Sequence, residues 1–206
     1  AVDPEARLRA AMADILGRHA DADLLVITGD LCNHGDAEAY ALLREILAPA
    51  PFPVRLLLGN HDRRPDLVAA FPDHPRDANG YIQSVLDTDS GRLLFLDTHE
   101  AGVIGGIYGA DRLAWLDAAL AEAGPAPVTV FVHHPPVADG IRHFRDISLH
   151  DDGALLARLV AHSAGVRHIV FGHIHMPLSG TSPEGIPYSS GQSLSLIHIS
   201  EPTRPY

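Results

Sequence analysis

Four short polar motifs, each placed directly after an apolar run, constrain this chain more than any other feature. They are Gly29-Asp30, Gly59-Asn60-His61-Asp62, His133-His134-Pro135-Pro136 and Gly172-His173-Ile174-His175. Asp, Asn and His supply the mixed oxygen and nitrogen ligands that suit divalent transition metals. Because α/β proteins gather their active groups at the carboxyl ends of strands, the four motifs together predict a metal site.

The apolar runs before the motifs are expected to be buried strands, and the periodic segments between them are expected to be helices. Strands are predicted at 23–28, 53–58, 128–132 and 166–171, and helices at about 4–16, 36–47, 111–123 and 152–162. A hairpin is predicted from two apolar runs, 81–86 and 92–97, that flank the turn-like sequence 87–91. This alternation predicts a layered α/β fold with a substantial parallel component.

Composition limits the partners of the chain. Its 206 residues, 46% of them hydrophobic, are enough for one domain with a substantial core. A formal charge of -11 argues against binding a nucleic-acid polymer, and no stretch approaches the roughly 20 apolar residues of a membrane helix. Cys32 is the only cysteine, so an internal disulfide is impossible and a cytoplasmic location is expected.

Taken together, the four motifs resemble those of the calcineurin-like metallophosphoesterase superfamily. Their residue sequences are most similar to those of its bacterial cyclic-nucleotide phosphodiesterase branch. The resemblance runs from about residue 1 to 193. It implies a layered β-sandwich flanked by helices, of the αββα type, with two divalent metal ions (Mn, Fe, Zn or Co). In that family the ions are bridged by a carboxylate and by a hydroxide, which attacks the phosphate.

The resemblance also assigns metal ligands. Asp30 would be the bridging carboxylate, and Asn60, His133 and His173 would complete the protein ligands of the second metal. His175 would belong to the first metal. His133 is preferred over His134 because the family pattern is His-x-Pro.

The chemistry gives independent reasons for these residue types. A carboxylate can bridge two cations about 3.5–4 Å apart. His173 and His175 are two residues apart, so an extended backbone would point both rings to the same side. His61 is placed to protonate the leaving alkoxide or to hydrogen-bond the transferring group, and Asp62 to orient its ring. Other histidines, His99 among them, are expected at the surface or in packing.

Each motif also has a simpler interpretation. Taken alone, Gly29-Asp30 would be typical of a strand-to-turn junction and His61 of a solvated or capping histidine. The pair His133-His134 would be typical of the end of a strand, and residues 172–175 of an exposed turn. Their conjunction in the order of the family favours a metal-dependent hydrolase of phosphodiesters, with 3′,5′-cyclic nucleotides as the first substrate by resemblance. Glycerophosphodiesters, or another phosphoester of the superfamily, are the alternative. The resemblance is also compatible with a homodimer.

The chain departs from the family pattern at both ends. Members of the family begin with a strand carrying Asp-x-His, which supplies two ligands to the first metal, and nothing upstream of Asp30 matches it. We therefore expect a domain over 1–193 that lacks its first strand and is incomplete at both ends. A metal-binding fragment without catalysis is then a third functional class. Residues 194–206 look like a translated sequencing adapter and are excluded from the predicted fold.

Overall fold

A computed structural model describes residues 3–136 and 145–194 of the chain. Its first half contains α1 (Pro4–Arg18), β1 (Leu25–Ile27), α2 (Ala37–Leu47), β2 (Val54–Leu56) and α3 (Arg64–Ala70). Its second half contains β3 (Ser84–Thr88), β4 (Gly91–Phe95), α4 (Ala110–Ala123), β5 (Val128–Val132), α5 (Asp152–Ala161), β6 (Val166–Phe171), β7 (Leu178–Thr181) and β8 (Pro187–Ser190). Apart from Leu194, the segment predicted to derive from an adapter lies outside the described residues.

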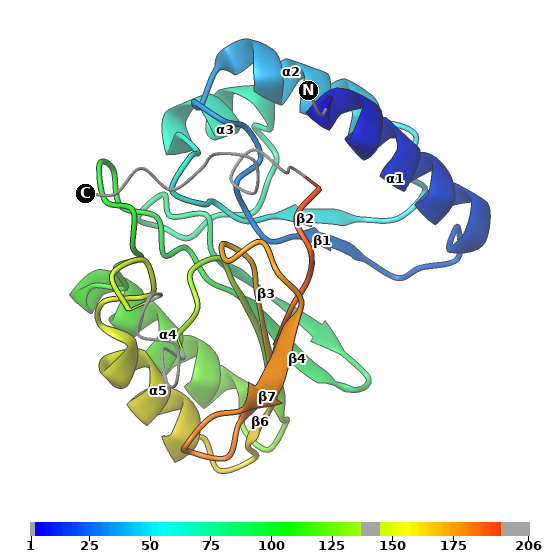
Figure 1. The fold of residues 1–206 in the computed structure, drawn as a ribbon. Coiled ribbons are helices and arrows are strands. Elements are labelled where there is room, and N and C mark those ends of the chain that lie inside the picture. The colour runs from blue at the N-terminus through cyan, green and yellow to red at the C-terminus, as the bar shows by residue number, and fades with distance from the viewer. Residues whose placement is uncertain (1–2, 137–144, 195–206) are drawn as a thin grey trace.

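The described strands form two sheets in neighbouring layers. β1 and β2 make a parallel pair, and the other six strands form a sheet of order β3-β4-β5-β6-β8-β7. Its central strands run parallel, and the β3–β4 and β7–β8 pairs at its edges are antiparallel. The Arg55 guanidinium of β2 lies 5.9 Å from the centre of the Phe95 ring of β4, which places the sheets against each other. Figure 1 shows α1, α2 and α3 around the small sheet, and α4 and α5 against the large one. The predicted α/β class is confirmed.

Hydrophobic periodicity located most of the elements. β5 and β6 have the predicted bounds, and α1 begins after Asp3, whose carboxylate accepts a hydrogen bond from the Ala6 N–H at 3.2 Å. The sequence prediction missed α3, β7 and β8. α3 has only seven residues, and β7 and β8 have four each, which is too short to establish a period.

The β3–β4 hairpin corrects one prediction. The expected connection 87–91 is wrong, because β3 continues through Thr88 and Thr88 pairs with Gly91. The Thr88 hydroxyl donates to the Gly91 carbonyl at 2.7 Å and accepts the Ser90 N–H at 3.2 Å. Asp87 belongs to the strand because it pairs with Arg92 across the ladder and forms an ion pair with it at 2.7 Å. Polar residues that are typical of a turn therefore form the end of a strand.

The interior contains two apolar clusters, one for each sheet. The larger cluster joins the six-stranded sheet to α4 and α5, and includes Leu94, Leu116, Val130, Leu155 and Ile169. The smaller cluster joins α1, α2 and α3 to the two-stranded sheet, and includes Met12, Tyr40, Leu43, Leu58 and Leu67. Both clusters contain residues of the apolar runs that precede the polar motifs, together with residues of the helices. The motifs therefore lie at the edges of the two clusters.

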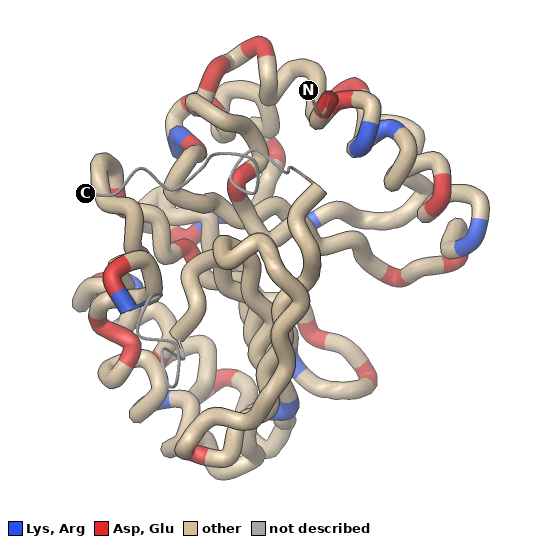
Figure 2. The backbone as a smooth tube through the Cα atoms, viewed as in Figure 1, with Lys and Arg blue, Asp and Glu red and all other residues tan. Residues whose placement is uncertain are grey.

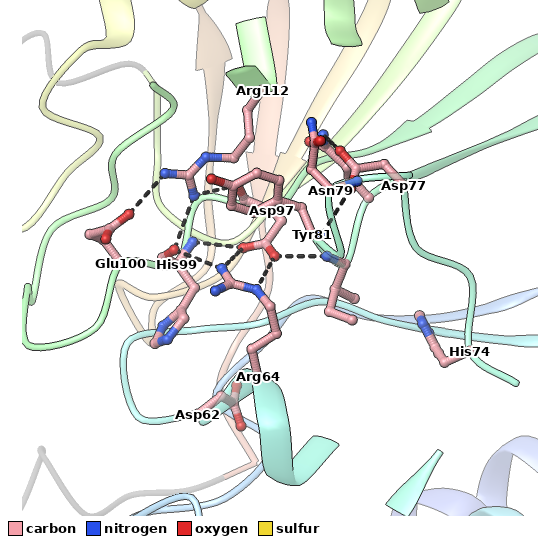
Figure 3. Close-up of polar contacts among 12 residues, drawn as sticks. Asp62, Arg64, His74, Asp77, Asn79, Tyr81, Asp97, His99, Glu100 and Arg112 are labelled. Carbon is pink, nitrogen blue, oxygen red and sulfur yellow. Dashed lines mark hydrogen bonds and ion pairs between the residues drawn. The ribbon is translucent and has the colours of Figure 1, made fainter. Parts of the chain in front are cut away.

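One buried carboxylate ties the two halves together. Asp97, which follows β4 and has no exposed surface, accepts hydrogen bonds from Nε and Nη2 of Arg64 at 2.9 and 3.0 Å. Arg112 of α4 donates to the carbonyls of Asp97 and His99 at 3.1 and 3.0 Å. Figure 3 shows both guanidinium groups converging on this point. Because Arg64 is the first residue of α3, the network anchors the preceding motif, 59–62, to the large sheet.

Charged residues lie mainly on the helices and connecting loops, and few lie on the strands (Figure 2). The acidic excess is spread over both halves of the molecule in this view. Within the described ranges, no helix has the length and apolar character needed to cross a membrane.

His74 gives a prediction about stability in acid. Its Nε2 accepts the Leu56 N–H at 2.9 Å, so the ring is neutral, and burial lowers the pKa of His74, as do the nearby charges of Arg55 and Arg76. Below about pH 6.5 the unfolded chain binds a proton at this residue that the folded chain does not. The free energy of unfolding therefore falls by up to about 1.4 kcal/mol for each unit by which the pH is lowered. His74→Gln keeps an acceptor and should flatten this decline between about pH 6.5 and about pH 5 in urea unfolding. An equally steep decline would contradict the prediction.

Candidate metal centre

Side chains from three of the strand-following motifs meet between the two sheets. Asp30 follows β1, His133 follows β5, and His173 and His175 follow β6. His133 Nε2 lies 3.4 Å from Asp30 Oδ1 and 3.1 Å from His173 Nδ1. His175 Nε2 lies 3.9 Å from Asp30 Oδ2. The structure thus brings four of the predicted ligands together, and their binding of metal stays a prediction.

Asn60, the fifth predicted ligand, borders this cluster through its two neighbours. The His61 N–H donates to Asp30 Oδ1 at 3.2 Å, and Gly59 packs against Asp30 on the other side. The side-chain oxygen of Asn60 is buried and accepts no hydrogen bond from the described residues. A buried amide oxygen without a donor costs about 1–3 kcal/mol, and a cation would relieve that cost.

Two further ligand atoms in this region lack a partner among the described residues, Nε2 of His134 and Nε2 of His173. Together with His133, these histidines bring one ligand nitrogen each within 4.8 Å of one another. Unpaired buried polar atoms are uncommon in folded proteins, and here they concentrate at one place. A divalent cation that accepts nitrogen and amide-oxygen lone pairs fits this donor set.

His133 and His134 are held differently. His133 Nδ1 donates to the Thr28 carbonyl at 2.6 Å, which directs Nε2 toward Asp30 and His173. On binding a metal, Nε2 would give up its proton and offer its lone pair. His134 is fully buried, and its Nδ1 lies 2.7 Å from the Thr98 hydroxyl oxygen. The sequence pattern made His134 a weaker candidate ligand than His133, whereas the structure brings both rings to the same cluster.

The backbone is strained at three of the predicted ligands. Asp30, His173 and His175 have φ angles of +53°, +66° and +56°, and no other non-glycine residue of the described ranges has a positive φ. The extended backbone expected for 173–175 is therefore wrong, and both rings reach the cluster from left-handed positions. Such residues cost of order 1–3 kcal/mol each and concentrate at functional sites.

Glycines make room for these side chains. A Cβ atom on Gly59 would collide with the Asp30 carboxylate and would lie 2.6 Å from Cε1 of His133. A Cβ on Gly29 would collide with Nδ1 of His133, and one on Gly172 would lie 2.9 Å from the Thr28 hydroxyl oxygen. The glycine that begins three of the four motifs is thus a requirement of packing.

Burial and neighbouring charges set the protonation of the cluster. Burial opposes the charge of Asp30, but the charge and hydrogen bond of His133 outweigh it and lower the pKa of Asp30 far below its usual range. Burial also opposes the charge of His133, and Asp30 outweighs it and raises the pKa of His133. Burial, together with the charge of His133, lowers the pKa of His173 to about 3 and that of His134 further. His173 and His134 are therefore neutral near pH 7, as a metal ligand must be.

A cavity of about 390 Å³ opens beside the cluster. Asp30, His133, His173 and His175 line it, as do apolar side chains of α1 and β1. His61, predicted as a proton donor, also lines this cavity, and its Nδ1 donates to the Asn33 carbonyl at 3.0 Å. A small molecule in the cavity would meet His61 together with four of the five predicted ligands.

Asp62, the other residue predicted as catalytic, is buried beneath the two ligand loops. Its carboxylate accepts the N–H groups of Leu31 at 3.1 Å and Gly59 at 2.8 Å, and the Tyr40 hydroxyl at 3.0 Å. Burial raises the pKa of Asp62, and these donors oppose that rise. Asp62 thus joins the loop carrying Asp30 to the loop carrying Asn60, a role that the sequence did not indicate.

Sequence reasoning missed two residues that support the site. His99 is buried, and its Nδ1 donates to the Gly59 carbonyl at 3.0 Å, next to Asn60. Tyr40 lies on the buried face of α2, and the apolar period that predicted the helix at 36–47 indicates no role for its hydroxyl. The buried carboxylate Asp97 lies two residues before His99 and accepts its N–H at 3.0 Å. The sequence gives no sign of this contact or of the burial of either residue.

The fold and site define an α/β protein with a candidate metal centre at the carboxyl ends of its strands. The chain belongs to the calcineurin-like phosphoesterase family, whose model matches residues 3–177. It is therefore a member of a hydrolase family, and the predicted resemblance is confirmed. The family implies divalent metal ions, and the buried unpaired atoms described above are chemically suited to bind them.

Named relatives include phosphodiesterases of two kinds. The chain is 37% identical over 203 residues to a probable cyclic nucleotide phosphodiesterase of Rhodopseudomonas palustris, covering 94% of this chain and 71% of that protein. It is 32% identical over 181 residues to the glycerophosphodiester phosphodiesterase GpdQ of Enterobacter lignolyticus, covering 84% and 63%. It is 31% identical over 153 residues to the 3′,5′-cyclic adenosine monophosphate phosphodiesterase CpdA of Pseudomonas aeruginosa, covering 74% and 54%. The chain thus spans less than two thirds of the last two proteins.

The fold is also similar to that of a solved dimetal phosphatase from Danio rerio. The TM-score is 0.73 at 17% sequence identity, and the match covers 92% of this chain and 78% of that one. At this identity the likeness concerns the fold.

Gly59→Ala tests the steric requirement at the site. Its Cβ would collide with Asp30, whose backbone is already strained, so we expect a loss of about 1–3 kcal/mol in the free energy of unfolding. Gly153→Ala is the matched control, because a Cβ there meets no atom within 4 Å. Urea unfolding of both variants measures the difference. Equal stability of the two variants would show that the loops have space to spare.

Proposed function

We propose that this chain binds divalent metal ions and hydrolyses phosphodiesters, with 3′,5′-cyclic nucleotides as its first substrate. The observation that carries the proposal is the cluster of Asp30, His133, His173 and His175 beside a buried, unpaired Asn60 oxygen. Two of the relatives named above, from Rhodopseudomonas palustris and Pseudomonas aeruginosa, support the cyclic-nucleotide substrate.

The proposed ligand set divides between two ions. Asp30, Asn60, His133 and His173 would hold one ion, and Asp30 and His175 would contribute to a second. Mn, Fe, Zn and Co all suit such nitrogen and oxygen donors. When bound, the ions supply Lewis acidity that acidifies water and offsets charge on the phosphoryl oxygens.

His61 is the proposed proton donor to the leaving oxygen. It lines the cavity, and the Asn33 carbonyl accepts its Nδ1–H at 3.0 Å. This contact fixes the ring with Nδ1 directed at Asn33, so Nε2 would be the atom that donates the proton. Asp62 would contribute indirectly, because it holds the loop that carries Asp30 against the loop that carries Asn60 and His61.

Glycerophosphodiester hydrolysis is the second candidate, supported by the GpdQ relative at 32% identity. Both substrates present the same phosphate to the cluster, so residues outside it decide between them. Initial rates on 3′,5′-cyclic AMP and on glycerophosphoethanolamine, with Mn²⁺ present, separate the two. Uptake of Mn²⁺ without turnover of either diester would instead support a metal-binding protein without catalysis.

Metal stoichiometry is the most direct test of the ligands. We expect one Mn²⁺ per chain in native mass spectrometry, because four of the proposed ligands serve one ion and only two serve the other. His173→Ala should lose this ion, whereas His19→Ala, at an exposed position at the end of α1, should keep it. A chain that takes up no Mn²⁺ would contradict the proposal. Uptake of two ions would show that the second position is better supplied than proposed.

His61→Ala tests the proton donor. Removing a general acid should lower turnover by roughly 100-fold or more, while the Mn²⁺ content stays near that of the wild type. The steady-state rate on the preferred diester and the metal content are measured on the same sample. Loss of metal in this variant would identify His61 as a ligand, and unchanged turnover would exclude it as the proton donor.

A further inference from the structure

Tyr40 is a buried residue that the proposed chemistry does not use. It lies in α2, has no exposed surface, and directs its hydroxyl at Asp62 and Arg63, which follow Asn60 in the chain. The hydroxyl accepts the Arg63 N–H at 2.9 Å. It donates to Asp62 Oδ1 at 3.0 Å.

These two hydrogen bonds use both functions of the hydroxyl. The Arg63 N–H can only donate, so the Tyr40 hydroxyl accepts from it, and its own proton is left to be donated to Asp62 Oδ1. A phenylalanine at position 40 would leave both groups without this partner. The carboxylate would keep its backbone donors, Leu31 and Gly59, but would lose the group that limits its rotation from the side of α2.

The two backbone donors of Asp62 belong to the ligand loops. Leu31 follows Asp30, whose backbone has a φ of +53°, and Gly59 precedes Asn60. A residue held in a strained conformation keeps it only when the surrounding contacts determine it. The position of the Asp62 carboxylate therefore controls how firmly Asp30 and Asn60 are held relative to each other.

We propose that Tyr40 is a positioning residue for the metal centre, acting through Asp62 on the loops of Asp30 and Asn60. The inference rests on the proposed function, because it assumes that these two residues bind metal. Partners that orient metal ligands typically contribute 10–100-fold to metal affinity. Tyr40 would be such a partner on a helix that contributes no ligand.

Tyr40→Phe is the test, and Tyr108→Phe is its matched control. Tyr108 is also fully buried, and its hydroxyl donates to Gln83 Oε1 at 3.0 Å. Each variant removes one buried phenolic hydroxyl, and thermal unfolding of both variants gives the loss of stability against which their metal affinities are compared. We expect only Tyr40→Phe to weaken Mn²⁺ binding, by about tenfold or more in a titration followed by electron paramagnetic resonance.

A second measurement does not depend on metal. In the metal-free chain, hydrogen exchange followed by NMR should be faster at the Leu31 and Gly59 amides in Tyr40→Phe than in Tyr108→Phe. Unchanged exchange at both amides would overturn the proposal. A wild-type chain that binds no Mn²⁺ would contradict the proposed function, and the exchange result would still decide whether Tyr40 positions the two loops.

A double-mutant cycle tests whether Tyr40 acts through Asp62. If it does, Tyr40→Phe should change Mn²⁺ affinity much less in an Asp62→Asn background than in the wild type. Equal effects in the two backgrounds would show that Tyr40 acts by another route, and would overturn the assignment.

Discussion

The candidate metal centre depends on backbone conformations that most residues avoid. Asp30, His173 and His175 are left-handed, and the turns that hold them are closed by their neighbours. The Leu31 N–H is bound by Asp62, and the Ile174 N–H donates to the Gly172 carbonyl at 2.7 Å. These local contacts offset a strain of a few kcal/mol. They direct carboxylate and imidazole groups toward one point instead of alternating them along a strand.

The ligands of the proposed centre come from both sheets. Asp30 and Asn60 follow the strands of the two-stranded sheet, whereas His133, His173 and His175 follow strands of the six-stranded sheet. Neither sheet carries the whole set. The site therefore exists only when the two layers are packed, and the glycines at its centre, Gly29, Gly59 and Gly172, allow the layers to approach that closely. Layer packing and site geometry are one structural requirement.

Much of this arrangement was predictable from the sequence, and the remainder depended on tertiary contacts. Apolar runs predicted β5 and β6 to the residue, because each run lies between turn-forming residues on one side and a polar motif on the other. Residue chemistry after those runs predicted the convergence of Asp30 with the histidines.

Other features had no local signal. Asp87 and Thr88 looked like turn residues, and cross-strand pairing with Arg92 and Gly91 made them part of β3. Tyr40 fitted the apolar period of α2, and nothing in that period marks a hydroxyl directed at Asp62. His99 meets Gly59 across 40 positions of sequence, a distance over which periodicity carries no information.

The ion pair between Arg64 and Asp97 affects how the molecule can open. Arg64 begins α3 directly after the 59–62 motif, and Asp97 is completely buried beside the large sheet. Opening the segment around Asn60 would move Arg64, whose side chain is 25% exposed, away from Asp97 and leave that buried carboxylate without its cationic partner, which is unfavourable. We therefore expect the opening of the loop that carries Asn60 to be coupled to the large sheet.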